Sequence, residues 1–442
     1  MSLQLLNEVS TERQRIVQTA RKFSEPLTSL NQYITVPWLI EAYKRTRKNG
    51  AAGIDDQTGA DYASNLEENL EDLCNRARSG SYFAPPVKRA WIPKGSGSEE
   101  LRGIGIPTFE DKVLQRAVTM ILEPIYEQEF SESSYGFRPT RSPHQAIEKI
   151  RSTIIRMGGG FVLEVDIRKF FDELDHRHLR EIMRLRINDG VINRLIGKWL
   201  NAGVLDKANI TYPKGGAPQG GVFSPLASNI FLNYVLDKWF EETVKPRLLG
   251  KAELVRFADD FVLLFKVKED ALRVEDVLGK RLGRFGLRIH PDKTRLIEFP
   301  RPSYGKIQGD KRVSETSFSF LGFTFYWDLS RNRKWIVKVK TAKDRLNRSI
   351  KEIAEWCRKY RHLPINDQCK ELNLKLRGHY QYFGVTHNMR SLRIFFRQTT
   401  RNWRKWLNRR DQRGKMPWDK FNNLLRYHKL LEPYLPRSIY RV

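Results

Sequence analysis

Three aspartates that end or interrupt apolar runs are the residues of this sequence best suited to chemistry. Asp166 follows the mostly apolar run 161–165, and Asp259 and Asp260 stand together between two further apolar runs. If these runs form neighbouring strands, the three carboxylates meet. Adjacent carboxylates repel one another unless a cation neutralises them, and Mg²⁺ prefers such oxygen ligands together with substrate phosphates. The pattern predicts a magnesium site; the alternative is acids that cap turns and face solvent.

A carboxylate-bound magnesium site suits one reaction class in particular. Two Mg²⁺ ions can activate a sugar 3′-hydroxyl and stabilise the leaving pyrophosphate in nucleotidyl transfer. The apolar residues on both sides of Asp259 and Asp260 favour this interpretation over a solvent-facing turn.

The hydrophobic pattern predicts the elements that position these carboxylates. Residues 254–265 predict a hairpin with acid at its tip. Helical periodicity at 110–130, 142–157 and 223–242 predicts helices, and residues 287–290 predict a further strand. This order of elements predicts an α+β fold with an antiparallel sheet covered by helices on one face.

The positive charge of the chain is large and unevenly distributed. The 442 residues include 79 Lys and Arg against 51 Asp and Glu, a formal net charge of +28, with 40% hydrophobic residues. Residues 331–442 hold 30 of the basic and 8 of the acidic side chains. We expect a folded body followed by a nucleic-acid-binding region, because phosphate backbones attract such charge. An anionic membrane surface and a ribosomal structural protein are the alternatives.

Cysteine use and hydropathy predict the compartment. Cys74, Cys357 and Cys369 are far apart in the sequence, which favours neither a disulfide framework nor a zinc site. The N-terminal residues carry charges throughout, and the chain has no uninterrupted apolar run of membrane-spanning length. We therefore expect a soluble protein of a reducing cytoplasm, with no membrane partner.

Several blocks of the sequence resemble those of reverse transcriptases, and in particular the group II intron-encoded branch of that family. The run 257–260 is similar to the Tyr-x-Asp-Asp signature, with Phe257 in place of the common tyrosine. The block Leu376–Phe383 resembles the maturase segment, where tryptophan is more usual at His379. Six further blocks follow the family's order: Asn49–Thr58, Ile104–Thr108, Ser134–Pro139, Asp166–His176, Ala217–Pro225 and Phe320–Phe323.

The resemblance implies a right-hand polymerase fold, with fingers, a palm containing the antiparallel sheet, and a helical thumb/maturase domain. It implies an N-terminal extension at 1–60, fingers and palm at 61–325, the thumb/maturase domain at 326–400, and a basic tail at 401–442 for which DNA is a candidate ligand. Because no Cys follows Cys369, we expect no metal-binding nuclease domain, so that a nick or a replication fork would supply the primer.

The resemblance also implies the catalytic and nucleotide-binding residues. Asp166, Asp259 and Asp260 would hold two Mg²⁺ ions, with Mn²⁺ as a substitute and the backbone carbonyl of Ile167 as a further ligand. Phe171 falls where the family has the aromatic ring that blocks a 2′-hydroxyl; the alternative is a plain core phenylalanine.

Three more residues match positions that contact the incoming nucleotide. Lys94 and Arg102 flank the Gly/Ser turn of a predicted basic hairpin at 88–107 and match residues that hold the triphosphate. Ordinary surface charge is the alternative. Gln219 corresponds to the glutamine that contacts the nucleotide, and a tight turn without a ligand is its alternative.

Positions near template and primer follow from the same resemblance. Arg138 and Lys293 resemble residues near template or primer, and Leu321 and Gly322 resemble the primer-grip turn. Gly103 stands where proline is frequent, which leaves the metal ligands unchanged.

The maturase block suggests an RNA-binding surface. Arg377, Tyr380 and Tyr382 interleave charge with aromatic rings, a composition that suits RNA phosphates and unpaired bases. The alternative is a helical bundle whose aromatic residues form the core.

Together these features predict an RNA-directed DNA polymerase of the group II intron type, with maturase activity that assists intron splicing and retrohoming. The expected partners are an RNA template, intron RNA, a DNA primer or target and deoxynucleoside triphosphates, with a homodimer left open. The rival hypotheses are a domesticated group II-like reverse transcriptase of DNA repair or phage defence, a non-enzymatic RNA-binding splicing cofactor, and a template-independent polymerase. The retained aspartates argue against the non-enzymatic cofactor.

Overall fold

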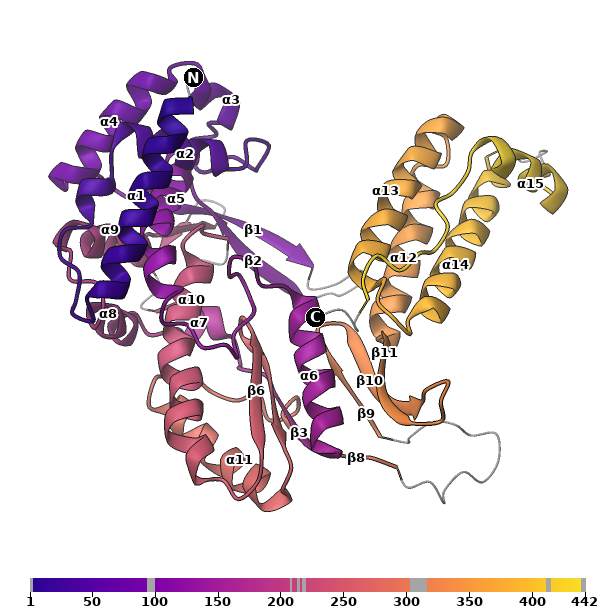
Figure 1. Cartoon of the computed structure of the whole chain (residues 1–442). Coiled ribbons are helices and arrows are strands. Elements are labelled where there is room, and N and C mark those ends of the chain that lie inside the picture. The colour runs from indigo at the N-terminus through magenta and orange to yellow at the C-terminus, as the bar shows by residue number, and fades with distance from the viewer. Residues whose placement is uncertain are drawn as a thin grey trace. The chain divides into compact units, whose positions relative to one another are not determined.

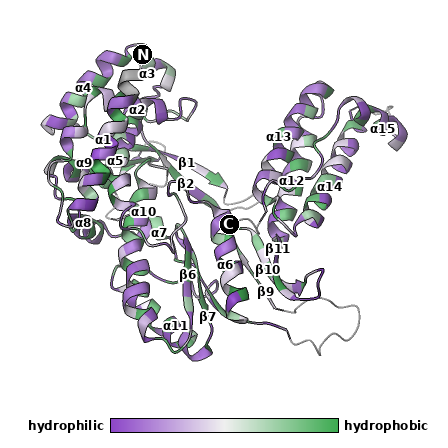
Figure 2. Cartoon of the chain, in the orientation of Figure 1, coloured by the Kyte–Doolittle hydropathy of each residue, from purple (hydrophilic) through white to green (hydrophobic). Residues whose placement is uncertain are grey.

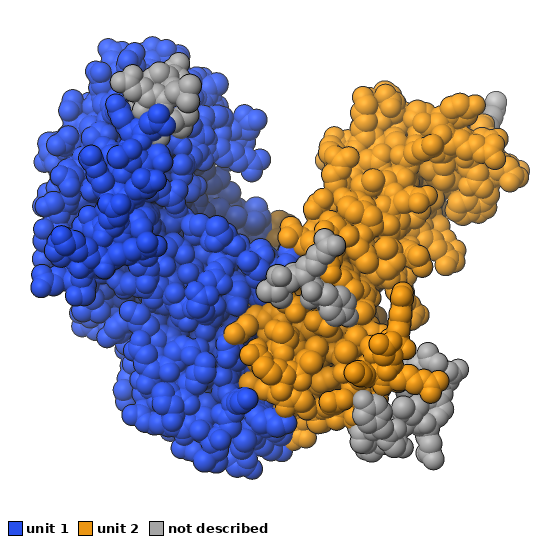
Figure 3. Space-filling view, in the orientation of Figure 1, with its two compact units in different colours: residues 1–92, 101–146, 161–296 blue, residues 93–100, 147–160, 297–442 orange. Residues whose placement is uncertain are grey.

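Two compact units organise the chain, and Figure 3 shows each in its own colour. Unit 1 comprises Met1–Ile92, Leu101–Ala146 and Phe161–Leu296, and unit 2 comprises Pro93–Glu100, Ile147–Gly160 and Ile297–Val442. The computed structural model describes residues 3–93, 100–206, 209–212, 215–216, 220–302, 316–410 and 415–438.

A group of helices packs around α5 in unit 1 (Figure 1). Thr108 caps α5 by accepting the amide of Asp111, and nearly all of the helix is buried because its apolar residues surround it. Trp38 in α2 is fully buried, and its indole Nε1 donates to the carbonyl of Ala117 at 2.9 Å. The helices are α1 (Leu3–Lys22), α2 (Val36–Arg45), α3 (Gly59–Ala63), α4 (Leu66–Ser79), α5 (Phe109–Tyr126), α8 (His176–Arg184) and α9 (Gly190–Leu200), with a 3-10 turn at Asn31–Tyr33.

A four-stranded sheet carries the predicted acidic residues. Its order is β6-β7-β3-β8, and β7 pairs antiparallel with both β6 and β3. Every residue of β7 after Asp260 is buried, as expected for a strand in the middle of a covered sheet. The strands are β3 (Gly159–Val165), β6 (Ala252–Phe257), β7 (Asp260–Phe265) and β8 (Arg295–Pro300).

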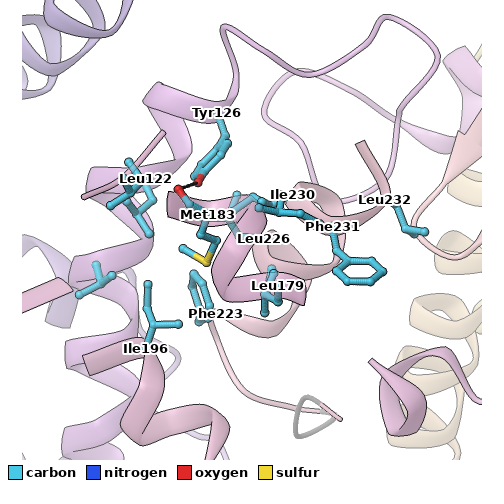
Figure 4. Packing of buried hydrophobic residues seen from close by; sticks show 14 of the residues in the cluster. Leu122, Tyr126, Leu179, Met183, Ile196, Phe223, Leu226, Ile230, Phe231 and Leu232 are labelled. Carbon is cyan, nitrogen blue, oxygen red and sulfur yellow. Dashed lines mark hydrogen bonds between the residues drawn. The ribbon is translucent and has the colours of Figure 1, made fainter. Parts of the chain in front are cut away.

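Helices that pack on this sheet join it to the rest of unit 1. α10 (Ser224–Leu232) continues as the π-helical segment Asn233–Val244, and α11 (Lys268–Gly283) packs against β7 and against that segment. Figure 4 shows side chains of α5, α8, α9 and α10 in one hydrophobic core, where the Tyr126 hydroxyl donates to the carbonyl of Met183. One continuous core therefore supports both the helices and the sheet.

A second, small sheet has the order β2-β1-β4-β5. β1 runs parallel to β4, and β4 pairs antiparallel with β5. Its strands are β1 (Val87–Pro93), β2 (Leu101–Ile106), β4 (Val204–Asp206) and β5 (Asn209–Thr211).

Unit 2 combines a three-stranded antiparallel sheet with helices. The sheet order is β11-β10-β9, and Val337 and Val339 of β11 are fully buried. Figure 2 shows hydrophilic and hydrophobic residues alternating along α12, α13 and α14, which share one core. The elements are β9 (Ser317–Phe320), β10 (Phe323–Leu329), β11 (Trp335–Thr341), α12 (Lys343–Lys359), α13 (Ile365–Phe383), α14 (Met389–Leu407) and α15 (Trp418–Tyr427), and most of α6 (Pro143–Met157) also belongs to unit 2.

The predicted α+β class with an antiparallel sheet is confirmed. The hairpin at 254–265 and the three helices lie close to their expected positions. The predicted strand at 287–290 is wrong: only Ile289 forms a bridge there, to Ile167, because the backbone turns away on both sides of that residue. The division into four domains stays a prediction.

Candidate active site

The turn between β6 and β7 carries Asp259 and Asp260. Phe257 pairs with Asp260 across the hairpin, and Ala258 takes a φ of 58°, in the left-handed region. Non-glycine residues enter that region rarely, so the surrounding structure must hold the turn in place. The hairpin places Asp259 at its tip, half-buried, and Asp260 at the exposed start of β7.

Backbone contacts from the segment 133–136 hold one side of this turn. The amide of Tyr135 donates to the carbonyl of Arg256, and the amide of Arg256 donates to the carbonyl of Ser133, both at 2.8 Å. A Cβ added to Gly136 would lie 2.3 Å from the backbone nitrogen of Ala258. Only glycine allows so close an approach of the two backbones.

A buried ion pair lies beneath the same turn. Arg256 and Asp237 have no exposed side-chain surface, and the guanidinium donates to both carboxylate oxygens at 2.8 and 2.5 Å. The same guanidinium donates to the carbonyl of Ala258 at 2.9 Å and to the side chain of Asn229 at 3.0 Å. Asn229 in turn donates to the carbonyl of Gly136 at 2.7 Å. This network fixes the backbone next to Asp259.

Asp166 lies at the end of β3, next to the β6–β7 turn. Val165 pairs with Phe261 across the sheet, so Asp166 lies just beyond the last paired residue of β3. Burial raises the pKa of the Asp259 carboxyl above its usual range, and the negative charge of Asp166 raises it further. The two carboxylates therefore share one electrostatic site.

Positive charges also reach this site. The ammonium of Lys293 lies 2.8 Å from Oδ2 of Asp166. Arg102, on β2, and Arg256 both act to lower the pKa of Asp259, against the effect of its burial. The site thus contains two carboxylates with basic side chains around them, as a site that binds both a metal ion and phosphates requires.

The carbonyl of Ile167 is not used by the backbone hydrogen bonds of its bridge to Ile289. The bridge between Ile167 and Ile289 uses the carbonyl of Asp166, which accepts from His290, and the amide of Arg168, which donates to Arg288, both at 2.8 Å. In an antiparallel bridge of this kind the carbonyl of the middle residue points to the other side.

The three predicted aspartate ligands fit a site for a divalent cation only in part. Within the described ranges, no group of three His, Cys, Asp or Glu side chains is gathered closely enough to hold a metal ion. The structure brings Asp166 and Asp259 into one site, whereas Asp260 begins β7 with an exposed side chain. Because Asp166 and Asp259 repel each other, a cation between them would be stabilised.

Phe171 lies in the short helix α7 (Phe170–Glu173). Its ring is half-buried and meets the buried ring of Phe170 edge-on, with centroids 5.3 Å apart.

Two glycines nearby approach other backbone segments closely. Gly216 takes a φ of 91°, and a Cβ there would lie 2.9 Å from the carbonyl oxygen of Phe171. Gly220, with a φ of 113°, approaches the carbonyl of Gly105 in the same way. At both positions a side chain would clash with neighbouring backbone, which explains why glycine stands there.

Two predicted nucleotide-binding residues, Gln219 and Lys94, lie outside the described residues. Arg102 lies within them: its side chain is exposed on β2 and acts electrostatically on Asp259.

Arg138 is buried inside unit 1. Its guanidinium pairs with Glu127 at 3.0 Å and donates to the carbonyls of Ser131 and Ser134. These bonds use the donors that a template phosphate would need, so the side chain is placed to hold the loop before Gly136.

The predicted primer-grip residues form the turn between β9 and β10 in unit 2. Leu321 and Gly322 have φ values of 49° and 78°. The hydroxyl of Tyr382 donates to the carbonyl of Leu321 at 3.0 Å, and the ring of Tyr382 lies against that of Phe323. The maturase block thus supports the turn directly.

The three residues of the predicted RNA surface have different environments. Arg377 is exposed, whereas Tyr380 is fully buried and its hydroxyl donates to the carbonyl of Leu431. The expectation that Tyr380 faces RNA is therefore wrong. On α13, Tyr380 falls on the apolar stripe with Leu372 and Leu376, which packs into the core.

The groups that support the site were not predicted from the sequence. Arg256 stands among the apolar residues 254–258 just before Asp259, which signals a buried charge that needs a partner. Nothing in the sequence identified Asp237 as that partner.

In the described part of the chain, no helix is both long and apolar enough to cross a bilayer.

Comparison with known proteins identifies the family. The family described as Reverse transcriptase (RNA-dependent DNA polymerase) matches residues 92–325, which is more than half of the chain and includes all three aspartates. The chain belongs to the reverse transcriptases. The expected resemblance and the α+β polymerase fold are thereby confirmed.

Similar proteins include one encoded by a group II intron and others named as intron proteins. The chain is 35% identical to Protein YkfC of Escherichia coli over 327 residues, covering 65% of this chain and 84% of that protein. It is 38% identical to the group II intron-encoded protein LtrA of Lactococcus lactis over 219 residues, 49% of this chain and 35% of LtrA. A putative COX1/OXI3 intron 2 protein of Saccharomyces cerevisiae is 38% identical over 173 residues, 39% of this chain and 20% of that protein. The chain thus spans most of YkfC but only about a third of LtrA.

Proposed function

We propose that this reverse transcriptase copies RNA into DNA at Asp166 and Asp259, and that it assists the splicing and retrohoming of an intron RNA. The observation that carries the proposal is the electrostatic coupling of these two carboxylates, which come from β3 and from the β6–β7 turn within the matched region. A carboxyl whose pKa is raised by burial and by a neighbouring carboxylate, as that of Asp259 is, is typical of a functional site.

The proposed reaction forms a bond between the primer 3′-oxygen and the α-phosphorus of a deoxynucleoside triphosphate. The bond from that phosphorus to the bridging oxygen breaks, pyrophosphate leaves, and the hydroxyl proton passes to solvent. Two Mg²⁺ ions, or Mn²⁺ in their place, would lower the pKa of the 3′-hydroxyl and neutralise the leaving group when bound. Asp166 and Asp259 would hold the ions, with Asp260 and the carbonyl of Ile167 as further ligands.

The nucleotide would be held from two sides. Arg102 and Lys94 would bind the triphosphate oxygens, for which a forked guanidinium and a compact ammonium are suited. Phe171 would meet the sugar and exclude a 2′-hydroxyl, and Gln219 would contact the nucleotide through the glycine-flanked loop.

Primer and template contacts are assigned to three places. Leu321 and Gly322 would contact the primer backbone, Lys293 would lie near the primer end, and Arg138 would act by holding its loop. All four assignments remain proposals.

A row of exposed basic residues on α14 supports RNA binding by unit 2. Arg390, Arg393, Arg397, Arg401 and Lys405 are exposed at spacings of three or four residues, which places them along one face of the helix. Among the described residues none of them has an ion-pair partner. RNA phosphates would bind to this row, releasing counterions, and the exposed Arg377 of α13 would add a further phosphate contact.

The proposed partners are an RNA template, intron RNA, a DNA primer and deoxynucleoside triphosphates. We place the protein in the bacterial cytoplasm because Protein YkfC and LtrA come from bacteria. A homodimer is neither proposed nor excluded.

Primer extension on an RNA template tests the polymerase. We expect extension with Mg²⁺ and deoxynucleotides by the wild-type protein and by Asp276→Asn, whose exposed side chain pairs with Lys280 on α11. Asp166→Asn and Asp259→Asn should each lose at least about a hundredfold in rate, because a neutral amide holds a cation poorly. Absence of extension by the wild type, with tight RNA binding retained, would contradict the proposal and favour a splicing cofactor without catalysis.

A further inference from the structure

A large hollow in unit 1 lies at α8 and α9. It has a volume of about 880 Å³, near the upper end of ordinary ligand sites. The segment 83–86, both helices and the strands around Gly203 and Tyr212 line it, and none of the proposed catalytic residues does. We call it the α8–α9 hollow.

The charge of the hollow is entirely positive. Its lining includes Arg180, Arg184, Arg194 and Lys198, and no acidic residue. Within the described ranges the three arginines have no ion-pair partner, and Nε of Arg180 is buried without a hydrogen-bond acceptor. Buried donors are nearly always paired, so Nε of Arg180, a residue that lines the hollow, is a donor that the described part of the protein leaves unsatisfied.

The walls of the hollow are held rigidly. The ammonium of Lys198 donates to the carbonyls of Gly80 and Tyr82, which ties α9 to the chain before β1. Asp189 caps α9 through the amides of Val191 and Ile192. Because these polar groups are satisfied within the protein, the arginines are the groups left for a ligand.

Two aromatic rings stand at the edge of the hollow. Phe83 and Tyr212 are 73% and 70% exposed, although rings of this size are usually covered. The ring of Tyr212 lies over Gly203, where an added Cβ would come within 3.1 Å of it. Exposed rings beside unpaired arginines are the combination on which unpaired bases stack while their phosphates bind the guanidinium groups.

We propose that the α8–α9 hollow binds an unpaired stretch of RNA outside the polymerase site. The arginines would bind its phosphates, Phe83 and Tyr212 would stack its bases, and the exposed amides of Asn188 and Asn201 would reach base edges and 2′-hydroxyls. This inference rests on the proposed function, which supplies RNA as the polyanion.

The first test removes the three arginine charges in the full chain. Arg180→Gln, Arg184→Gln and Arg194→Gln together should weaken binding of a fluorescent oligouridine of about 16 nucleotides by roughly tenfold at moderate salt. The slope of log affinity against log salt should also decrease by about 2, since each phosphate contact to a single strand contributes about 0.7.

A matched control removes the same charge elsewhere. Arg273, Lys280 and Arg284 are exposed on or next to α11, and changing all three to Gln leaves the hollow intact. An equal loss of affinity in this control, or unchanged binding in the hollow variant, would overturn the proposal. Circular dichroism and thermal unfolding show whether either triple variant still folds.

A second test locates the RNA directly. Oligouridine carrying a photoreactive base should crosslink to Phe83 or Tyr212 in the wild type, and Phe83→Ala with Tyr212→Ala should abolish those crosslinks. A DNA strand of the same sequence that crosslinks equally well would contradict the assignment to RNA, since only the 2′-hydroxyl distinguishes the two.

The proposal of RNA binding in the hollow and the proposal of polymerase activity can be disproved independently. Extension of a primer by a few nucleotides, on a template with no unpaired RNA other than the nucleotides being copied, needs no RNA in the hollow. We expect the rate of this extension to change less than about twofold in the hollow variants. Loss of extension by the wild type, with the crosslinks retained, would reject the polymerase alone.

Discussion

The ammonium of Lys293 lies 2.8 Å from Oδ2 of Asp166, so a residue after α11 neutralises the carboxylate that ends β3. Both side chains are accessible to solvent, the lysine 61% and the aspartate 36%. An exposed pair of this kind contributes little stability. It would instead compete with a divalent cation for the same oxygen.

Removing that competitor should strengthen cation binding. In Lys293→Met we expect the Mg²⁺ concentration that gives half-maximal extension to fall about two- to fivefold, because no ammonium has to leave Asp166. The maximal rate should fall as well if the lysine also contacts primer, and a magnesium titration separates the two effects. Lys280→Met, which breaks the remote pair with Asp276, serves as the control, and a raised magnesium requirement in Lys293→Met would contradict the expectation.

The buried Arg256–Asp237 pair should be essential to the turn. Arg256→Met leaves Asp237 buried without its partner, which costs roughly 3–5 kcal/mol of unfolding free energy. The double variant Arg256→Met, Asp237→Leu should recover much of that stability. It should not recover primer extension, because the bond to the carbonyl of Ala258 is still missing.

Urea titration and extension assays, made on the same preparations, measure both quantities. Full recovery of extension in the double variant would show that the guanidinium does not position Asp259.

Gly136 should tolerate no side chain. Gly136→Ala places a Cβ 2.3 Å from the backbone nitrogen of Ala258, so either the turn or the segment 133–136 must move. We expect extension to fall at least about tenfold, since displacements of about an ångström at a catalytic group have such effects. Gly283→Ala, at the end of α11 with nothing within 4 Å, should leave activity unchanged.

Near-wild-type extension by Gly136→Ala would show that this contact does not set the position of Asp259.

The burial of His379 should make unit 2 sensitive to acid. Burial lowers its pKa to about 4, and its ring stacks on that of Phe395 with centroids 3.8 Å apart. Among the described residues its Nε2 has no hydrogen-bond partner. The unfolded chain binds a proton near the ordinary pKa of 6.5 whereas the folded chain does not, so stability is lost as pH falls from about 6.5 to 4. The contribution of this residue is at most roughly 3 kcal/mol.

His379→Phe should remove that loss and keep the stacking. We expect its unfolding free energy to change less than that of the wild type between pH 6.5 and 4.5, as urea titration measures. His387, whose pKa burial also lowers to about 4, remains in the variant, so part of the acid sensitivity persists. His362→Phe, at an exposed position, is the control. Identical pH profiles for His379→Phe and the wild type would contradict the assignment.

Much of this protein was predictable because the relevant signals are local in the sequence. The apolar runs on both sides of Asp259 predicted a hairpin, and β6 and β7 form it. Strand alternation and helix periodicity depend on neighbours within a few residues, so both patterns can be recognised without knowledge of the fold. The family blocks likewise identified the aspartates, because each block is a contiguous stretch.

Contacts between distant segments were decided by the tertiary structure. Composition alone favoured an RNA-facing Tyr380, but the packing of α13 against its neighbours buries it. The strand expected at 287–290 shortened to one bridge, because pairing needs a partner along its whole length and the chain offers one only at Ile167.

The sequence by itself determined which residues can do the chemistry: the acids, the basic C-terminal region and the order of helices and strands. The tertiary structure alone decided how the acids are held, through Asp237 beneath Arg256, Gly136 against Ala258 and Lys293 on Asp166. The physical reason is that side-chain type and local periodicity are properties of short stretches. Burial, ion pairing and backbone approach depend instead on which distant segments the fold brings together.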